Sequence, residues 1–287
     1  PVYNKNGTAP GMWFNDGKQV FVSMPGVPFE MQAMMQNDVM PKLKQQFEAM
    51  PLIHKTIQTQ GIGESNLSDL IASWENDLPA YLKLAYLPAA GMVRLRLTGK
   101  GVKDLEQEMN VRIDKLKELI APYLFGYDDD TIQLVVGKLL TEKKKTLAVA
   151  ESCTGGFLSH LITSIPGSST YFMGGTVCYS NASKMSQLQV SAQTLKEYGA
   201  VSEAVAVEMA IGARKAYNTD FALSTTGIAG PDGGSAEKPI GLVWIGVATE
   251  NTCFAKKFLL GTNRQRIIQV AADTALNMLR KKINEHN

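Results

Sequence analysis

The sequence predicts a layered α/β protein whose C-terminal part is built on a mostly parallel sheet. Helical and extended segments alternate from residue 131 onward, the order that parallel strands and crossover helices produce. Upstream, residues 82–86 and 93–97 alternate apolar and polar side chains, as antiparallel strands with one wet face do. The length of 287 residues suggests about two domains. We therefore expect a C-terminal α/β sandwich preceded by smaller units.

The first 49 residues predict only part of a domain. Short apolar segments at 12–14 and 19–24 flank Asn15-Asp16-Gly17, a sequence that suits the tight turn of a β-hairpin. Apolar residues at helical spacing predict a helix from Pro28 to Pro41. One hairpin and one or two helices make a poor domain, and the sequence begins at Pro1 without a Met. We expect residues 1–49 to be the tail of a truncated α/β domain.

Residues 50–127 predict a small βαββα module, and residues 128–287 predict the larger α/β domain. The module's expected order is strand 53–59, helix 65–74, strands 81–87 and 93–98, and helix 102–119. The aspartates at 128–130 are expected to cap the next helix. In the larger domain the expected helices are 132–143, 154–164, 182–187, 202–217 and 264–282, and the expected strands are 146–150, 176–180, 221–225, 242–248 and 253–260.

Composition excludes several classes of protein. The net charge of +2 gives no bulk electrostatic support for nucleic-acid binding. The apolar run at 240–249 is too short for a membrane span. The three cysteines, Cys153, Cys178 and Cys253, suit a reducing compartment better than a disulfide framework. We therefore expect a cytoplasmic protein with no membrane partner and no nucleic-acid partner.

The first candidate site is Glu151-Ser152-Cys153-Thr154-Gly155-Gly156, which follows an apolar strand and opens an amphipathic helix. A strand, tight turn and helix in this order can expose a nucleophile and direct free backbone N–H groups at one point. Those groups suit an oxyanion or a phosphate. The alternative is a helix cap at Ser152 or Thr154 with glycines that allow close packing, and the local sequence alone favours that alternative.

Two further polar loops follow strands. Tyr179-Ser180-Asn181-Ala182-Ser183-Lys184 ends one strand, and a glycine-rich loop, Thr225 to Gly234, ends another. Each alone is explained by a capped surface helix or an ordinary loop. The glycine-rich loop lacks the Gly-Lys-Ser/Thr of a Walker motif. Because ligands bind at the carboxyl ends of strands in open α/β sheets, three such loops together predict a cleft there.

A serine nucleophile needs a base, and the histidines do not supply one. His160 lies eight residues after Ser152, about 12 Å along a helix. His54 falls in another module, and His286 falls at the end of the chain. A lysine base is the natural substitute, provided that burial or a neighbouring cation lowers its pKa from about 10.4. Lys184, among polar loop residues, fits this role.

The sequence gives little support for a cysteine nucleophile or a zinc site. Cys153 is a rival nucleophile, but no partner that would stabilise its thiolate is evident in the sequence. With three histidines and no cysteine pairs at ligand spacing, a zinc site is not expected. The sequence therefore predicts no metal and no cofactor.

Four blocks of the sequence resemble the CinA C-terminal domain family, which includes nicotinamide mononucleotide deamidases. The blocks are Ala150 to Gly156, Tyr179 to Lys184, Gly199 to Ser202 and Gly227 to Gly234, in the family's order, and the match runs from about residue 131 to 282. Upstream, residues 7–11 and 25–31 look like the end of a molybdopterin-binding-like domain. Residues 61–65 look like the opening of a module that is KH-like in the family.

The resemblance implies a Ser-Lys amidohydrolase that releases ammonia from nicotinamide mononucleotide. It implies that Ser152 is the nucleophile, Lys184 its base and Tyr179 a helper in proton transfer. The residues expected to bind substrate are Thr154, Gly155, Gly156, Asn181, Thr226, Gly227 and Arg264. Many relatives carry a second arginine four residues after Arg264, where this chain has Ile268. The ADP-ribose pyrophosphatase activity of the family's front domain is not assigned to this chain.

Two alternatives come from other classes. In the first alternative, the C-terminal domain is a nucleotide-binding module without catalytic activity. In the second, the KH-like module binds nucleic acid. KH domains clamp nucleic acid with a Gly-X-X-Gly loop, and Gly61-Ile62-Gly63 lacks that spacing. We expect a small-molecule nucleotide substrate, no nucleic-acid partner, and a homodimer in which the KH-like module is a spacer or dimerisation element.

Overall fold

The computed structural model describes residues 1–47 and 52–285. They form two compact units, the first from Pro1 to Leu52 with Lys100 to Lys103, and the second from Ile53 to Gly99 and from Asp104 onward. The expected boundary between residues 49 and 50, like His286, lies outside the described residues. No helix among the described residues is long and apolar enough to cross a membrane.

The first unit contains the predicted hairpin, β1 (Met12–Asn15) paired antiparallel with β2 (Val20–Ser23). Its helical part begins at Pro28 as expected, but the end predicted at Pro41 is wrong. Helix α1 (Pro28–Met34) continues through a π-helical turn (Met35–Val39) into α2 (Met40–Gln46). Pro41 lies in the first turn of α2 and takes the position where a missing N–H costs no helical hydrogen bond.

The N-terminal part of the second unit is the small α+β module. Its sheet has the order β4-β5-β3-β6. The predicted order of strands and helices is present, and a four-residue strand, β6, adds to it by pairing antiparallel with β3. The bounds are β3 (Leu52–Gln60), α3 (Glu64–Asn76), β4 (Leu82–Ala89), β5 (Met92–Lys100), α4 (Leu105–Ile120) and β6 (Leu124–Tyr127).

The C-terminal domain is a three-layered α/β sandwich on a five-stranded sheet of order β11-β10-β9-β7-β8. The sheet is mixed, because β7 is parallel to β8 and β9 while β9, β10 and β11 are antiparallel neighbours. The strands are β7 (Leu147–Glu151), β8 (Phe172–Val177), β9 (Phe221–Gly227), β10 (Leu242–Ala248) and β11 (Cys253–Leu259). The helices are α5 (Ile132–Glu142), α6 (Phe157–Thr163), α7 (Asn181–Leu188), α8 (Ala192–Tyr198), α9 (Glu203–Tyr217) and α10 (Arg264–Glu285).

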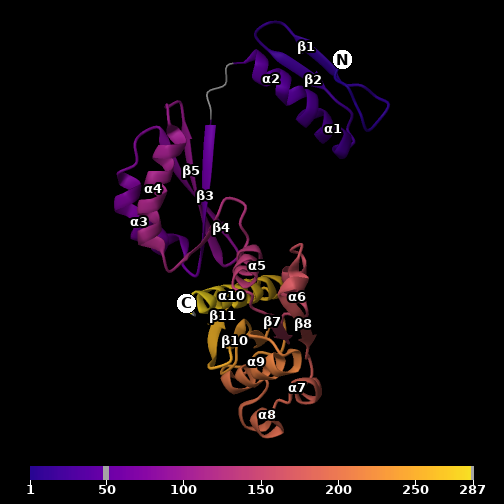
Figure 1. The fold of residues 1–287 in the computed structure, drawn as a ribbon, viewed down its shortest axis with the longest axis vertical. Coiled ribbons are helices and arrows are strands. Elements are labelled where there is room, and N and C mark those ends of the chain that lie inside the picture. The colour runs from indigo at the N-terminus through magenta and orange to yellow at the C-terminus, as the bar shows by residue number, and fades with distance from the viewer. Residues whose placement is uncertain (48–51, 286–287) are drawn as a thin grey trace. The chain divides into compact units, whose positions relative to one another are not determined.

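Alternation along β7 explains the layers. Leu147 and Val149 belong to the core shared with α5, α6 and α10, whereas Ala148 and Ala150 belong to the core shared with α9. Figure 1 shows α9 and α10 on opposite sides of the strands. Burial on both faces explains why this strand reads as a continuous apolar run.

The predicted cap of α5 is wrong, and the alternative of a helix cap at Ser152 or Thr154 does not hold either. Helix α5 is capped by Thr131, whose hydroxyl accepts the Leu134 N–H, and not by the aspartates at 128–130. Asp128 instead accepts the backbone N–H of Thr56 at 2.9 Å. Neither Ser152 nor Thr154 caps α6, because its N-cap is Gly156 in a left-handed conformation. The backbone N–H groups at the start of α6 donate instead to the Glu151 carboxylate.

Candidate active site

Ser152 and Lys184 come together beyond the ends of two neighbouring parallel strands. Ser152 directly follows β7, and Lys184 lies in the first turn of α7, after β8. The Lys184 Nζ lies 3.0 Å from Ser152 Oγ and 2.7 Å from the carbonyl oxygen of Cys178. The distance that the sequence interpretation requires is therefore present, whereas the catalytic roles stay predictions.

The Lys184 side chain is enclosed by protein, with 1% of its surface exposed. Burial lowers the pKa of Lys184, because the charged ammonium loses its hydration. No carboxylate pairs with Lys184 in the described part of the chain, so no ion pair there offsets that loss. A larger share of this amine is therefore neutral near pH 7 than of an exposed lysine.

The turn that carries Ser152 is fixed from both sides. The Ser152 N–H donates to the Thr225 carbonyl at 2.9 Å, which continues the parallel pairing of β7 with β9. The Glu151 carboxylate, fully buried, accepts the N–H groups of Gly156, Leu158 and Ser159 at 2.8–3.0 Å. These are the free donors of the first turn of α6, so Glu151 replaces a helix cap.

Gly155 and Gly156 turn the chain between Ser152 and α6. Their φ angles are +60° and +99°, values that favour glycine. A β-carbon at Gly155 would contact nothing within 4 Å, so backbone conformation and not space requires glycine there. The turn leaves the N–H groups of Cys153 and Thr154 without an acceptor on another residue in the described part of the chain. They belong to the first and second residues after the serine, where an oxyanion hole would need donors.

Three of the predicted substrate-binding residues are engaged within the protein. The Thr154 hydroxyl shares a hydrogen bond of 2.7 Å with the Thr225 hydroxyl, and the Thr226 hydroxyl donates to the Ala200 carbonyl at 2.7 Å. Arg264 begins α10, and its Nη1 donates to the Gly230 carbonyl at 2.6 Å. Asn181 is exposed at the start of α7, and Gly227 ends β9 half-buried.

Tyr179 is not hydrogen-bonded to either member of the pair within the described residues. It is 64% exposed, and its hydroxyl accepts from Arg264 Nη2 at 3.3 Å. The contact joins the loop after β8 to the start of α10. Tyr179 and Arg264 therefore form an exposed, cationic rim.

Sequence analysis missed the supporting groups of this site. A carboxylate that ends an apolar strand just before a helix start was a usable signal for Glu151, because helix N-termini attract carboxylates. In the sequence, Thr225 is recognisable only as the start of the glycine-rich loop. The Cys178 carbonyl has no side-chain signal at all, since any residue carries a carbonyl.

Burial makes Cys153 and Cys178 poorly suited to act as nucleophiles. Burial raises the pKa of the Cys153 thiol to about 12, so its thiolate is scarce at neutral pH. Burial also raises the pKa of Cys178.

Within the described residues, no group of three or more His, Cys, Asp or Glu side chains is placed to hold a metal ion.

Two family models match the chain. Residues 129–283 match the family described as "CinA C-terminal domain", and residues 54–126 match the "Damage-inducible protein CinA KH domain". A "CinA-like protein" of Cytophaga hutchinsonii is 45% identical over 284 residues, which cover 98% of this chain and 68% of the relative. A "CinA-like protein" of Flavobacterium psychrophilum is also 45% identical, with the same coverage.

Solved structures match about half of the chain. The competence/damage inducible protein CihA from Agrobacterium tumefaciens is 38% identical, with a TM-score of 0.52, covering 53% of this chain and 93% of that one. The competence damage-inducible protein A from Klebsiella pneumoniae is 30% identical, with a TM-score of 0.53 and coverages of 54% and 97%. The chain therefore belongs to the CinA family, as an α/β protein with a CinA KH domain and a CinA C-terminal domain.

Proposed function

We propose that the C-terminal domain hydrolyses the carboxamide of nicotinamide mononucleotide to nicotinate mononucleotide and ammonia. The observation that carries this proposal is the buried Lys184 amine, 3.0 Å from Ser152 Oγ and without a carboxylate partner in the described part of the chain. A structural lysine would pair with an acidic group or reach water. A neutral amine beside a hydroxyl is suited to general-base catalysis.

In the first half of the reaction, the lone pair of Lys184 accepts the Ser152 hydroxyl proton while Oγ attacks the carboxamide carbon. The Cys178 carbonyl accepts an N–H of the amine, which aims the lone pair at the serine. The carbonyl oxygen of the substrate becomes negative, and the N–H groups of Cys153 and Thr154 supply its hydrogen bonds. The ammonium of Lys184 then returns the proton to the leaving nitrogen, the carbon–nitrogen bond breaks, and ammonia departs.

In the second half, water hydrolyses the ester between Ser152 and the nicotinate carbonyl. Lys184 accepts a proton from the water, the hydroxide attacks the carbonyl carbon, and the bond to Oγ breaks. The proton returns from Lys184 to Oγ and restores the serine. The same amine thus serves both steps, as microscopic reversibility requires of an acid and base pair.

The rim supports recognition of the nucleotide phosphate. Arg264 is exposed, and the Gly230 carbonyl and the Tyr179 hydroxyl hold its guanidinium. A guanidinium so fixed keeps donors free for phosphate oxygens. Tyr179 is itself exposed beside it and can close over the nicotinamide ring.

The test is ammonia release from nicotinamide mononucleotide, followed by a coupled assay, with chromatographic detection of nicotinate mononucleotide. We expect equal amounts of both products, and none from Ser152→Ala. Nicotinamide riboside, which lacks the phosphate, should react with a higher KM if Arg264 holds that phosphate. A wild-type protein that binds the nucleotide but releases no ammonia would leave the silent binding module as the better description.

A further inference from the structure

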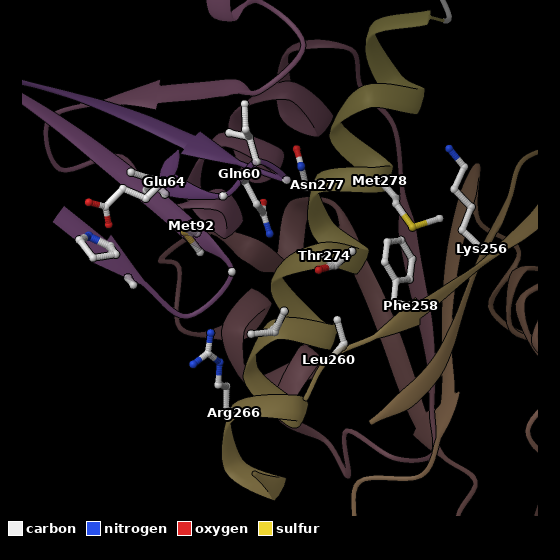
Figure 2. Close-up of a pocket in the computed structure, with 18 of the residues that line it drawn as sticks. Gln60, Glu64, Met92, Lys256, Phe258, Leu260, Arg266, Thr274, Asn277 and Met278 are labelled. Atoms are coloured by element: carbon white, nitrogen blue, oxygen red, sulfur yellow. The ribbon is translucent and has the colours of Figure 1, made fainter. Parts of the chain in front are cut away.

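One cavity of the C-terminal unit is lined by neither Ser152 nor Lys184. It has a volume of about 650 Å³ and lies inside the second unit, between the loop after β3, the turn joining β4 to β5, strand β11 and one face of α10. Figure 2 shows these segments around it. Cavities of this size hold small organic ligands in other proteins. Nothing in the proposed amidase reaction uses it.

Gln60, the last residue of β3, is the feature that points to a ligand. Its side chain is 98% buried, and neither its amide oxygen nor its amide nitrogen has a hydrogen-bond partner among the described residues. Figure 2 shows the amide directed into the space framed by Met92, Thr274 and Asn277. Because an unpaired buried amide costs free energy, a donor and an acceptor on an incoming molecule would stabilise this site.

Positive charge gathers around the same cavity. Lys256, Arg266 and Lys281 line it, and none of them forms an ion pair within the described residues. Partial burial lowers the pKa of Lys281, and the nearby charges of Arg280 and Lys256 lower it further. The acidic residue of the lining is Glu64, whose carboxylate points away from Gln60 in Figure 2. The cavity is thus suited to an anion.

The remaining wall is apolar and suits a flat ring. Met92, Phe258 and Met278 line it. Thioether sulfurs and an aromatic ring make favourable contacts with planar π-systems. A glutamine amide pairs in two-point fashion with the edge of a base that carries adjacent donor and acceptor atoms.

We propose that this cavity is a binding site for a nucleoside monophosphate. Gln60 pairs with the edge of the base, Met92, Phe258 and Met278 enclose its faces, and the cluster of Lys256 and Lys281 holds the phosphate. The site is separate from the catalytic serine, so the proposal does not rest on the amidase reaction.

Calorimetric titration of the whole chain with AMP tests the site, with UMP, adenosine and inorganic phosphate as further arms. AMP should bind. Adenosine, which lacks the phosphate, and inorganic phosphate, which lacks the base, should each bind at least tenfold more weakly. The comparison of AMP with UMP shows whether Gln60 prefers the purine edge.

Matched variants locate the binding. Lys256→Glu should weaken AMP binding at least tenfold, whereas Lys257→Glu, its exposed neighbour on β11 outside the cavity lining, should leave it unchanged. Gln60→Leu keeps the volume and removes the unpaired amide, so it should lose AMP binding while its melting temperature stays equal or rises. A lower melting temperature in Gln60→Leu, without any effect of AMP on the parent protein, would mean that the amide is structural.

Two outcomes would overturn the proposal. One is the absence of AMP and UMP binding at millimolar concentration in a protein whose fold is intact by circular dichroism. The other is binding that survives both Gln60→Leu and Lys256→Glu but disappears in Arg264→Ala, which would place the nucleotide at the Ser152 site. Ammonia release from nicotinamide mononucleotide is measured separately, so failure of either proposal leaves the other standing.

Discussion

Ser159 gives Glu151 both its backbone N–H, at 2.8 Å, and its hydroxyl, at 2.6 Å, on the same carboxylate oxygen. The other oxygen accepts the N–H groups of Gly156 and Leu158, each at 3.0 Å. Four donors thus converge on one buried carboxylate adjacent to Ser152. The orientation of the Ser152 turn depends on this anchor.

Glu151→Gln should therefore destabilise the protein and slow catalysis. A glutamine presents an NH₂ group to donors, so at least one buried N–H loses its acceptor, at a cost of about 1–3 kcal/mol. We expect kcat to fall more than KM changes, since the turn aims the nucleophile. Urea unfolding and steady-state kinetics measure the two effects. Glu142→Gln, an exposed change of equal charge on α5, is the control, and equal behaviour of the two variants would contradict the anchoring role.

Ser152→Ala and Lys184→Ala should each abolish turnover, and the double variant should be no worse than either. The effects of substituting residues that act as one catalytic unit are not additive, because the loss of one residue already leaves the other without a function in catalysis. Lys184→Arg should fail as well, since arginine keeps its proton near neutral pH. Rates of ammonia release measure all four. Substantial turnover by Lys184→Arg would show that only positive charge is needed at this position.

Activity should rise with pH and then level off, at a pH below the ordinary range of lysine. The pKa of Lys184 is lowered by burial, so the neutral amine becomes available earlier than in an exposed lysine. The same shift affects stability. Between the folded and unfolded pKa values the unfolded state binds more protons, so stability rises with pH in that window. A kcat/KM profile measured over pH 6–10 that is flat would remove Lys184 as the titrating base.

Cys153→Ala should keep most of the amidase activity. With a pKa raised to about 12 by burial, the thiol supplies almost no thiolate at pH 7. The side chain is 5% exposed and belongs to the core beneath α6, so the expected effect is a loss of stability of about 1 kcal/mol. Activity and thermal unfolding measured on one preparation separate these effects. Complete inactivation of a folded variant would favour a thiol mechanism.

Asp273→Asn should stabilise the protein above pH 7. Burial raises the pKa of Asp273 to about 7, and its Oδ2 has no hydrogen-bond partner within residues 1–47 and 52–285. Because the folded carboxyl holds its proton between pH 3.8 and about 7 while the unfolded one does not, wild-type stability falls as pH rises through that window. The variant lacks this loss and should gain up to about 4 kcal/mol at pH 8 and nothing near pH 4.

Denaturant unfolding at both pH values measures the Asp273 effect. Asp69→Asn, an exposed change of equal charge on α3, should show no pH-dependent difference from the parent protein. A variant of Asp273 that is equally destabilised at pH 4 and pH 8 would show that packing, and not titration, governs this position.

The sequence by itself determined the alternation of elements and the position of the serine. The apolar run before Glu151 indicates a buried strand, and the glycines after Thr154 favour a turn, because these preferences are local. The expected helix start at residue 154 is wrong, since α6 begins at Phe157. Local sequence signals did not predict the elements whose extent depends on tertiary packing. They ended a helix at Pro41, although a preceding π-helical turn lets the chain continue, and they did not find the four-residue strand β6, which exists through its pairing with β3.

Only the tertiary structure decided that Lys184 is a buried amine beside Ser152. The two residues lie 32 positions apart, and parallel pairing of β7 with β8, which sets Glu151 beside Val177, brings their loops together. Burial then changes the chemistry of the amine, and burial is a property of the packed layers and not of any local pattern. The unpaired amide of Gln60 has the same origin, since a strand residue shows no sign in the sequence of lacking a partner.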